Sequence, residues 1–331
     1  MSTNRSAFRR VIVLGTGGTI AGRAVAADDN IGYTAAEVGV ADLLHGIDAP
    51  AGVDLLAEQV AQVDSKDMSH AIWQALAVRC AHWLAQADVA GIVITHGTDT
   101  LEETAYFLQV VLAPAKPVVL TCAMRPSTAL APDGPQNVRD AIVVAATPGA
   151  RGVVAACAGR VHGALDVQKV HTYRLDAFES GDAGPLAHVE EGALRQVRDW
   201  PTAQAAGATA FARMAALDPV RWPRVDIVVS HAGVTGHLVD ALIRERATGE
   251  ADAIAGLVLA ATGNGTLHEM LEAAALRAEA AGVAVWRATR CAEGRILPTA
   301  HATLPDAGAL SPVKARIALM LHLLPDAATA A

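Results

Sequence analysis

Two stretches of the sequence decide the fold: VIVLGTGGTIA at residues 11–21 and GIVITHGTDT at residues 91–100. Each begins as a run of β-branched and other apolar residues, which is typical of a strand buried on both faces of a parallel sheet. Each run then breaks into glycines and hydroxyl-bearing residues. Loops that leave the carboxyl ends of such strands line the ligand crevice of an open α/β sheet. We therefore expect Thr19 and the Thr98-Asp99 pair to reach one site.

Similar apolar runs recur along the chain and mark candidate strands, at residues 11–15, 91–95, 117–121, 152–156, 225–230, 256–261 and 282–287. Helical patterns lie between many of them, and this alternation predicts two α/β domains. The larger, N-terminal one is expected to have a mostly parallel, doubly wound sheet, and the C-terminal one is smaller. A stretch rich in Trp-Pro pairs and alanine breaks the rhythm. We therefore predict a catalytic domain at 1–195, a linker at 196–222 and a second domain at 223–331.

Composition excludes several classes of partner. The chain has 331 residues and a net charge of −8, without a basic cluster, which argues against binding to nucleic acid or anionic membranes. No apolar run is long enough to cross a bilayer, and the polar start lacks a signal sequence, so we expect a cytoplasmic protein. A periplasmic location would require that a signal peptide had been removed. The four cysteines show no metal-ligand spacing, and because three of them sit in apolar runs, reduced core thiols are expected.

The glycines after the first apolar run suggest a nucleotide-binding loop, but the pattern is incomplete. A dinucleotide fingerprint would place its third glycine at the position of Ile20. Residues 22–34 show no helical pattern, although a pyrophosphate needs a helix N-terminus. A loop over a small-molecule pocket is favoured, and no cofactor or metal is expected. A dinucleotide-dependent oxidoreductase remains an alternative, which bound cofactor in the purified protein would support.

Four motifs in the same order resemble those of the bacterial L-asparaginase family, amidohydrolases with threonine nucleophiles. They occupy residues 16–21, 95–105, 123–128 together with 133–135, and 263–265. The resemblance implies hydrolysis of the side-chain amide of L-asparagine to aspartate and ammonia through a threonine acyl-enzyme. It also implies a fold of two α/β domains and a homotetramer built from two intimate dimers.

The resemblance assigns catalytic roles to five residues. Thr19 is the implied nucleophile, and Tyr33 in the loop that follows is the implied assistant. Thr98, Asp99 and Lys169 form the second implied cluster, in which the lysine shares or accepts the threonine proton and the aspartate orients the group. A threonine hydroxyl is a weak nucleophile, so it needs such a proton acceptor and an oxyanion site. Without the resemblance, Lys169 would be taken for an ordinary surface lysine and Tyr33 for a packing residue.

The resemblance implies substrate binding for three positions, and the charge of Lys66 suggests a fourth. Ser65 would hold the α-carboxylate, and it could also, or only, cap the helix that follows. Asp99 would pair with the α-ammonium, and the backbone carbonyl of Ala123 would meet the leaving amide. Lys66 is placed beside the carboxylate site. His96 is expected to be a structural histidine that makes hydrogen bonds.

The sequence departs from the family pattern at two positions. Lys66 stands where an uncharged or acidic residue is common, and Thr266 stands where many secreted members have asparagine. Glu293 is a weak candidate for the acid that a neighbouring subunit contributes. We predict a preference for asparagine over glutamine from these departures, unless Lys66 points to solvent and Thr266 only packs at an interface.

Three other kinds of protein could carry some or all of these motifs. A dual glutaminase-asparaginase would carry every one of them. The archaeal tRNA-dependent amidotransferase subunit contains the same domain, but it is disfavoured because no extra domain precedes Val11. A non-catalytic amino-acid sensor would bind asparagine without releasing ammonia, and the full set of implied catalytic residues argues against it.

Overall fold

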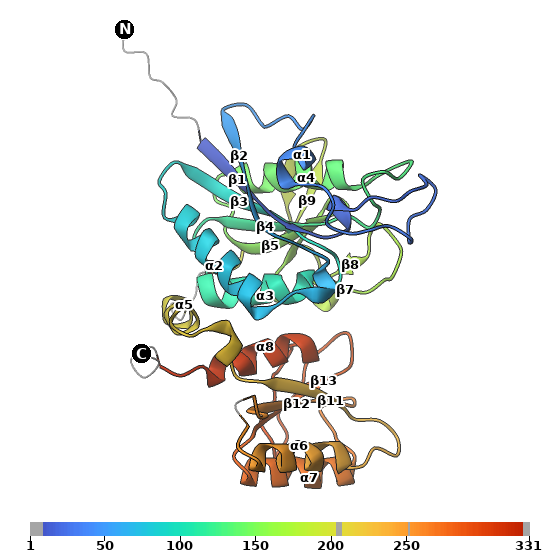
Figure 1. The fold of residues 1–331 in the computed structure, drawn as a ribbon, viewed down its shortest axis with the longest axis vertical. Coiled ribbons are helices and arrows are strands. Elements are labelled where there is room, and N and C mark those ends of the chain that lie inside the picture. The colour runs from blue at the N-terminus through green and yellow to red at the C-terminus, as the bar shows by residue number, and fades with distance from the viewer. Residues whose placement is uncertain (1–8, 203–206, 251, 327–331) are drawn as a thin grey trace. The chain divides into compact units, whose positions relative to one another are not determined.

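The computed structural model describes residues 9–202, 207–250 and 252–326 (Figure 1). The chain forms two compact units that divide between Phe211 and Ala212. The predicted linker, 196–222, contains this division, and it also carries the helix α5 (Gly207–Ala216) and the 3-10 helix η4 (Pro219–Arg221).

The first unit contains an eight-stranded sheet in the order β10-β9-β6-β5-β4-β3-β1-β2. Five strands run parallel: β1 (Arg9–Gly17), β2 (Val53–Val63), β3 (Val89–Thr95), β4 (Pro117–Thr121) and β5 (Gly152–Cys157). Three short strands continue the sheet with antiparallel pairing: β6 (Arg160–Gly163), β9 (Ala187–Glu190) and β10 (Ala193–Gln196). The mostly parallel sheet predicted from the apolar runs is confirmed.

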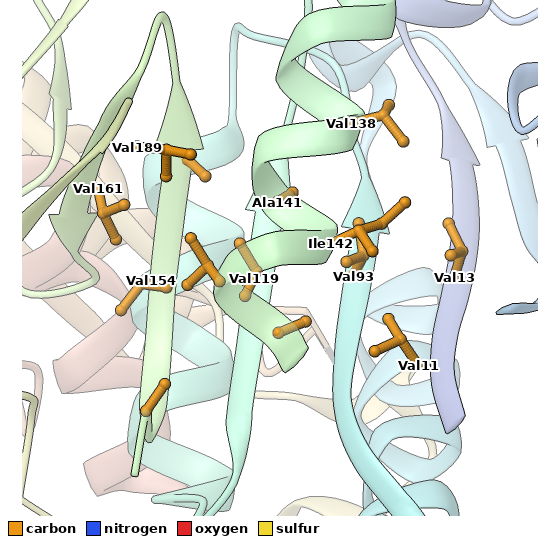
Figure 2. Close-up of a cluster of buried hydrophobic side chains, with 14 of the residues drawn as sticks. Val11, Val13, Val93, Val119, Val138, Ala141, Ile142, Val154, Val161 and Val189 are labelled. Carbon is orange, nitrogen blue, oxygen red and sulfur yellow. The ribbon is translucent and has the colours of Figure 1, made fainter. Parts of the chain in front are cut away.

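Helices cover both faces of this sheet (Figure 1). The short helix α1 (Val40–Leu43) and α4 (Gly134–Ala146) lie on one face, and α2 (His70–Leu84) and α3 (Leu101–Leu112) lie on the other. Figure 2 shows Val138, Ala141 and Ile142 of α4 over the valines of the sheet. Because β1, β3, β4 and β5 are buried on both sides over most of their length, they must be apolar on both sides, which explains their continuous apolar sequences.

Short elements complete the first unit near the carboxyl ends of the parallel strands. The 3-10 helices η1 (Thr19–Ala21) and η2 (Ser65–Asp67) follow β1 and β2. The two-residue strands β7 (Gln168–Lys169) and β8 (Phe178–Glu179) form a small antiparallel pair, with η3 (Gly181–Ala183) after it.

The second unit is a smaller α/β layer built on a parallel sheet of β11 (Val225–Val229), β12 (Gly256–Ala261) and β13 (Ala284–Thr289). The helices α6 (His237–Ala247) and α7 (Glu269–Ala280) cover one face, and α8 (Pro312–Leu323) covers the other (Figure 1). The predicted two α/β domains are therefore present. Within the described residues, every helix is too short or too polar to cross a bilayer.

Candidate active site

The turn that carries Thr19 is held directly against the turn that carries Thr98. Gly17 and Gly18 adopt φ angles of 102° and 82°, which L side chains disfavour. A Cβ atom added at Gly18 would lie 2.3 Å from both N and Cα of Gly97. The residues that precede the two threonines are thus in backbone contact. The ends of β1 and β3 bring the two predicted groups together.

This contact predicts a large effect for Gly18→Ala. Gly46 provides a matched control, because its φ is 80° but an added Cβ would meet nothing within 4 Å. Gly46→Ala should therefore cost only the conformational strain, about 1 kcal/mol, whereas Gly18→Ala must also push the two turns apart. We expect a clearly larger fall in melting temperature for Gly18→Ala, measured by circular dichroism. Equal falls for the two variants would contradict the close approach.

Thr19 lies under a loop that places Tyr33 on it. The Thr19 hydroxyl is buried, and its Oγ1 lies 2.6 Å from Oη of Tyr33. The loop is fixed at its base by paired backbone bonds between Arg23 and Thr34. Its first residues are tied to a second loop, since Ser127 Oγ donates to the carbonyl of Gly22 at 2.7 Å. Tyr33 is therefore positioned to exchange a proton with Thr19.

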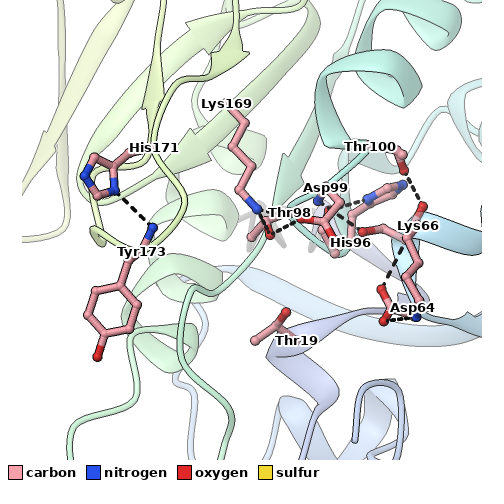
Figure 3. Close-up of polar contacts among 12 residues, drawn as sticks. Thr19, Asp64, Lys66, His96, Thr98, Asp99, Thr100, Lys169, His171 and Tyr173 are labelled. Carbon is pink, nitrogen blue, oxygen red and sulfur yellow. Dashed lines mark hydrogen bonds and ion pairs between the residues drawn. The ribbon is translucent and has the colours of Figure 1, made fainter. Parts of the chain in front are cut away.

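Thr98, Asp99 and Lys169 form a second polar cluster (Figure 3). Nζ of Lys169, on β7, lies 2.7 Å from Oγ1 of Thr98 and 2.6 Å from Oδ1 of Asp99. The Lys169 side chain is 19% exposed, whereas that of Asp99 is 53% exposed. Thr98 is buried, and its hydroxyl can donate to Asp99 over 3.4 Å. An amine in contact with a buried hydroxyl is an arrangement that can activate a nucleophile.

Ser65 joins β2 to this cluster. It is buried, and its Oγ accepts the backbone N–H of Asp99 at 3.1 Å. Its carbonyl accepts the hydroxyl of Thr100 at 2.7 Å. The alternative that Ser65 caps the following helix is wrong, because Ser69 is the N-cap of α2 and accepts the N–H of Ile72. Ser65 is thus bonded to the segment that carries Asp99 and Thr100 and does not cap the helix.

The amine of Lys66 pairs with acidic side chains outside the cluster of Thr98, Asp99 and Lys169. Its Nζ lies 2.5 Å from Oδ2 of Asp64 and 3.4 Å from Asp67, and the side chain is 61% exposed. The hydrogen bond to Asp64 raises the pKa of Lys66. No ion pair joins it to Asp99 among the described residues. The predicted contact between Lys66 and a substrate carboxylate stays a prediction.

A clamp that the sequence analysis missed holds the backbone around Ala123. The Asp133 carboxylate accepts the N–H groups of Met124 and Arg125 at 2.9 and 3.0 Å. The buried Asn137 donates from Nδ2 to the carbonyl of Cys122 at 2.9 Å. The available signal was Asp133 at the start of a Gly-Pro helix, a typical capping position. In the structure, Asp133 makes no side-chain cap bond and instead fixes the Ala123 turn.

His96 has the structural role that the sequence predicted. It is fully buried, and this burial lowers its pKa to about 4. Its Nδ1 lies 2.7 Å from the carbonyl of Gly97, and its Nε2 lies 2.9 Å from Oγ1 of Thr104. Trp73 Nε1 in turn donates to Thr104 at 2.9 Å. A neutral imidazole that donates from Nδ1 and accepts at Nε2 fits all three bonds.

The remaining predicted positions lie in the second unit. Thr266 forms a pair of backbone bonds with Thr262 and a hydroxyl contact of 2.9 Å with the same residue. Glu293 is exposed.

Two other site types lack support in the described ranges. No group of three His, Cys, Asp or Glu side chains there could hold a metal ion. After β1 the chain enters the three-residue helix η1, which offers no helix N-terminus long enough to bind a pyrophosphate.

Comparisons with known proteins agree with this geometry. The family model for the N-terminal asparaginase domain matches residues 10–201, and that for the glutaminase/asparaginase C-terminal domain matches residues 224–328. L-asparaginase 2 of Bacillus subtilis is 36% identical over 94% of this chain and 81% of its own length. L-asparaginase 2 of Escherichia coli is 35% identical over 96% and 89%.

A glutaminase-asparaginase and a solved structure extend the comparison. Glutaminase-asparaginase of Pseudomonas fluorescens is 33% identical over 96% of this chain and 87% of its own length. The crystal structure of a probable cytoplasmic L-asparaginase from Campylobacter jejuni superposes with a TM-score of 0.85, at 33% identity and with 96% of each chain covered. Since family models match both units and these relatives span nearly the whole sequence, the chain belongs to the asparaginase family of amidohydrolases.

Proposed function

We propose that the protein is an L-asparaginase that converts L-asparagine to L-aspartate and ammonia without a cofactor. The observation that carries this proposal is the pairing of two hydroxyl groups with their proton partners. Thr19 contacts Tyr33, and Thr98 contacts Lys169, on two turns that touch. Two such groups suit a reaction in which an ester is first formed and then hydrolysed.

In the proposed first step, Oγ1 of Thr19 attacks the side-chain amide carbon, and its proton passes to Tyr33. Backbone N–H groups stabilise the oxyanion. Collapse of the intermediate breaks the C–N bond, the proton taken up by Tyr33 passes to the nitrogen, and the nitrogen leaves as ammonia beside the carbonyl of Ala123. The clamp of Asp133 and Asn137 supports this role, because it holds that part of the backbone in place.

In the proposed second step, water hydrolyses the β-aspartyl ester on Thr19. The water is positioned on the side of Thr98 and Lys169, where the amine can share the proton that is released. The exposed carboxylate of Asp99 is proposed to pair with the α-ammonium, and Ser65 to hold the α-carboxylate. Hydrolysis frees aspartate and restores the hydroxyl of Thr19.

A dual glutaminase-asparaginase is the second candidate, supported by the similarity to the Pseudomonas fluorescens protein of that name. The two candidates differ in how well glutamine is turned over. One additional methylene group shifts the amide relative to Thr19, and such a difference is worth about 1–3 kcal/mol in a fitted pocket. We therefore expect kcat/KM for asparagine to exceed that for glutamine by roughly tenfold or more.

An ammonia-release assay with both substrates checks this prediction. Lys66→Gln and Thr266→Asn test the two departures from the family pattern. A lower preference for asparagine in either variant would assign the selectivity to that residue, and unchanged ratios in both would remove the proposed cause. Equal use of the two substrates by the wild type would favour the dual enzyme. Binding of asparagine without ammonia release would instead indicate a sensor.

We also propose that the protein is a cytoplasmic homotetramer, assembled as two dimers. Family membership supports the assembly, and the description of the Campylobacter jejuni neighbour as cytoplasmic supports the location. Light scattering at the assay concentration should give four times the chain mass of 34.1 kDa. A fully active species with the mass of one chain would contradict the need for assembly.

A further inference from the structure

Two cysteines meet at the ends of neighbouring strands below the candidate site. β4 and β5 are parallel neighbours in which Leu120 pairs with Ala155, so Cys122 and Cys157 follow in the same register. Their Sγ atoms lie 3.3 Å apart. Neighbouring strands are about 4.8 Å apart, which falls within the Cα separation of about 4.4–6.8 Å that a disulfide requires. The backbone spacing is therefore already suitable for a bond between these sulfur atoms.

The other cysteines have different surroundings. All four are free thiols, but Cys80 is buried inside α2 and Cys291 is exposed in the second unit. Cys122 and Cys157 are 2% and 5% exposed. Only a small oxidant should therefore reach this pair, whereas Cys291 is open to larger reagents. Cys291 can therefore serve as an internal control for the access of oxidants to Cys122 and Cys157.

The surroundings of Cys122 keep its thiol protonated. The hydrogen bond with Cys157, followed by burial, raises the pKa of Cys122 well above its usual value, and the positive charge of Lys169 acts in the opposite direction. Most of the thiol stays protonated at neutral pH, so its reaction should be slow.

We propose that Cys122 and Cys157 are an oxidisable dithiol, which a hydroperoxide converts to a disulfide in the folded protein. Sγ of one of the two cysteines attacks an oxygen of hydrogen peroxide and breaks the O–O bond, which gives a sulfenic acid and one water. Sγ of the other cysteine then attacks this sulfur and displaces hydroxide, which leaves as a second water with the proton of the attacking thiol. The two thiols lose two electrons, and hydrogen peroxide is reduced to two waters.

The disulfide would act on the backbone of the candidate site. The carbonyl of Cys122 accepts the hydrogen bond from Asn137, and Ala123 is the next residue. Drawing the two sulfur atoms together must shift Cys122 relative to this bond. We therefore expect oxidation to lower asparagine turnover, and reduction by dithiothreitol to restore it. This second effect rests on the proposed function, whereas formation of the disulfide does not.

Peptide mapping of the peroxide-treated protein tests the proposal. The folded full-length chain is treated with hydrogen peroxide, its remaining thiols are alkylated after denaturation, and its peptides are mapped without reduction. Wild type and the control Cys291→Ser should both give the cross-link between Cys122 and Cys157. Cys157→Ala should give none, and its turnover should not show the fall that the disulfide causes in the wild type.

Two results would overturn the proposal. One is that Cys122 and Cys157 are both alkylated after a treatment that has fully oxidised Cys291 in a protein that is still folded. The other is that the cross-link forms only after the protein has been unfolded. If Cys157→Ala does not fold, the wild-type map alone decides. If the cross-link is found but ammonia release is unchanged, the disulfide forms as proposed and its proposed effect on turnover is refuted.

Discussion

Replacing Lys169 by methionine is expected to lower asparagine turnover by about 10³-fold or more while the fold stays intact. Methionine keeps the apolar stem but removes the amine that contacts Oγ1 of Thr98 at 2.7 Å and Oδ1 of Asp99 at 2.6 Å. Without it, Thr98 loses the group with which it is proposed to share a proton, and the negative charge of Asp99 loses its ion-pair partner. The loss should appear mainly in kcat, because the proposed role concerns proton transfer and not binding.

Lys116→Met is the matched control for Lys169→Met. Nζ of Lys116 donates to the carbonyls of Leu84 and Gln86 at 3.0 and 2.6 Å, away from the polar cluster. The same chemical change there should cost some stability and leave turnover nearly unchanged. Circular dichroism and ammonia release on both variants make the comparison. Near-normal turnover by a folded Lys169→Met variant would refute the role of the amine.

Thr19→Val is expected to lower turnover by a similar or larger factor, because it removes the proposed nucleophile while nearly keeping its shape. The buried Thr19 would also lose its contact of 2.6 Å with Tyr33. Quenching the wild type during turnover and mapping the peptides by mass spectrometry should place the aspartyl adduct on Thr19. The variant should show no adduct.

Thr16→Val serves as the control in the same turn. The Thr16 hydroxyl donates to the carbonyl of Thr95 at 2.9 Å, which is a structural bond. Its loss should lower the melting temperature without preventing acylation. An adduct on Thr98 in place of Thr19 would reverse the assignment of the two threonines.

The parallel strands were predictable because their burial leaves a direct trace in the sequence. β3 and β4 are covered on both faces and consist almost entirely of apolar residues, so continuous runs identified them. β2 was missed, although it is eleven residues long. It lies at the edge of the sheet, and its half-exposed positions carry polar residues such as Glu58, whose carboxylate pairs with Arg79. The three antiparallel strands are only four residues long and carry too little pattern to be recognised.

The candidate site was predictable to a different extent at each residue. Thr19 and Thr98 are in distinctive motifs after strongly apolar strands, so their approach could be inferred from topology. Lys169 has no such local signal, since it reaches Thr98 from 71 residues away. Asp133 and Asn137 act on backbone atoms, and backbone groups leave no trace in the sequence. Local patterns thus predict the strand ends, whereas contacts between distant segments require the folded chain.

The contact between Gly18 and Gly97 has a consequence for how substrate enters and product leaves. Because the two turns touch through their backbones, opening a gap between the two threonines would require the turns themselves to move. We therefore expect substrate to reach Thr19 from the side of Tyr33, whose loop is held by side-chain bonds such as that from Ser127 to Gly22. We expect this loop to swing out and back in every catalytic cycle, so that its opening rate sets a ceiling on turnover. The contact between the two turns keeps the reacting groups aligned, and the loop controls the entry of substrate and the exit of product.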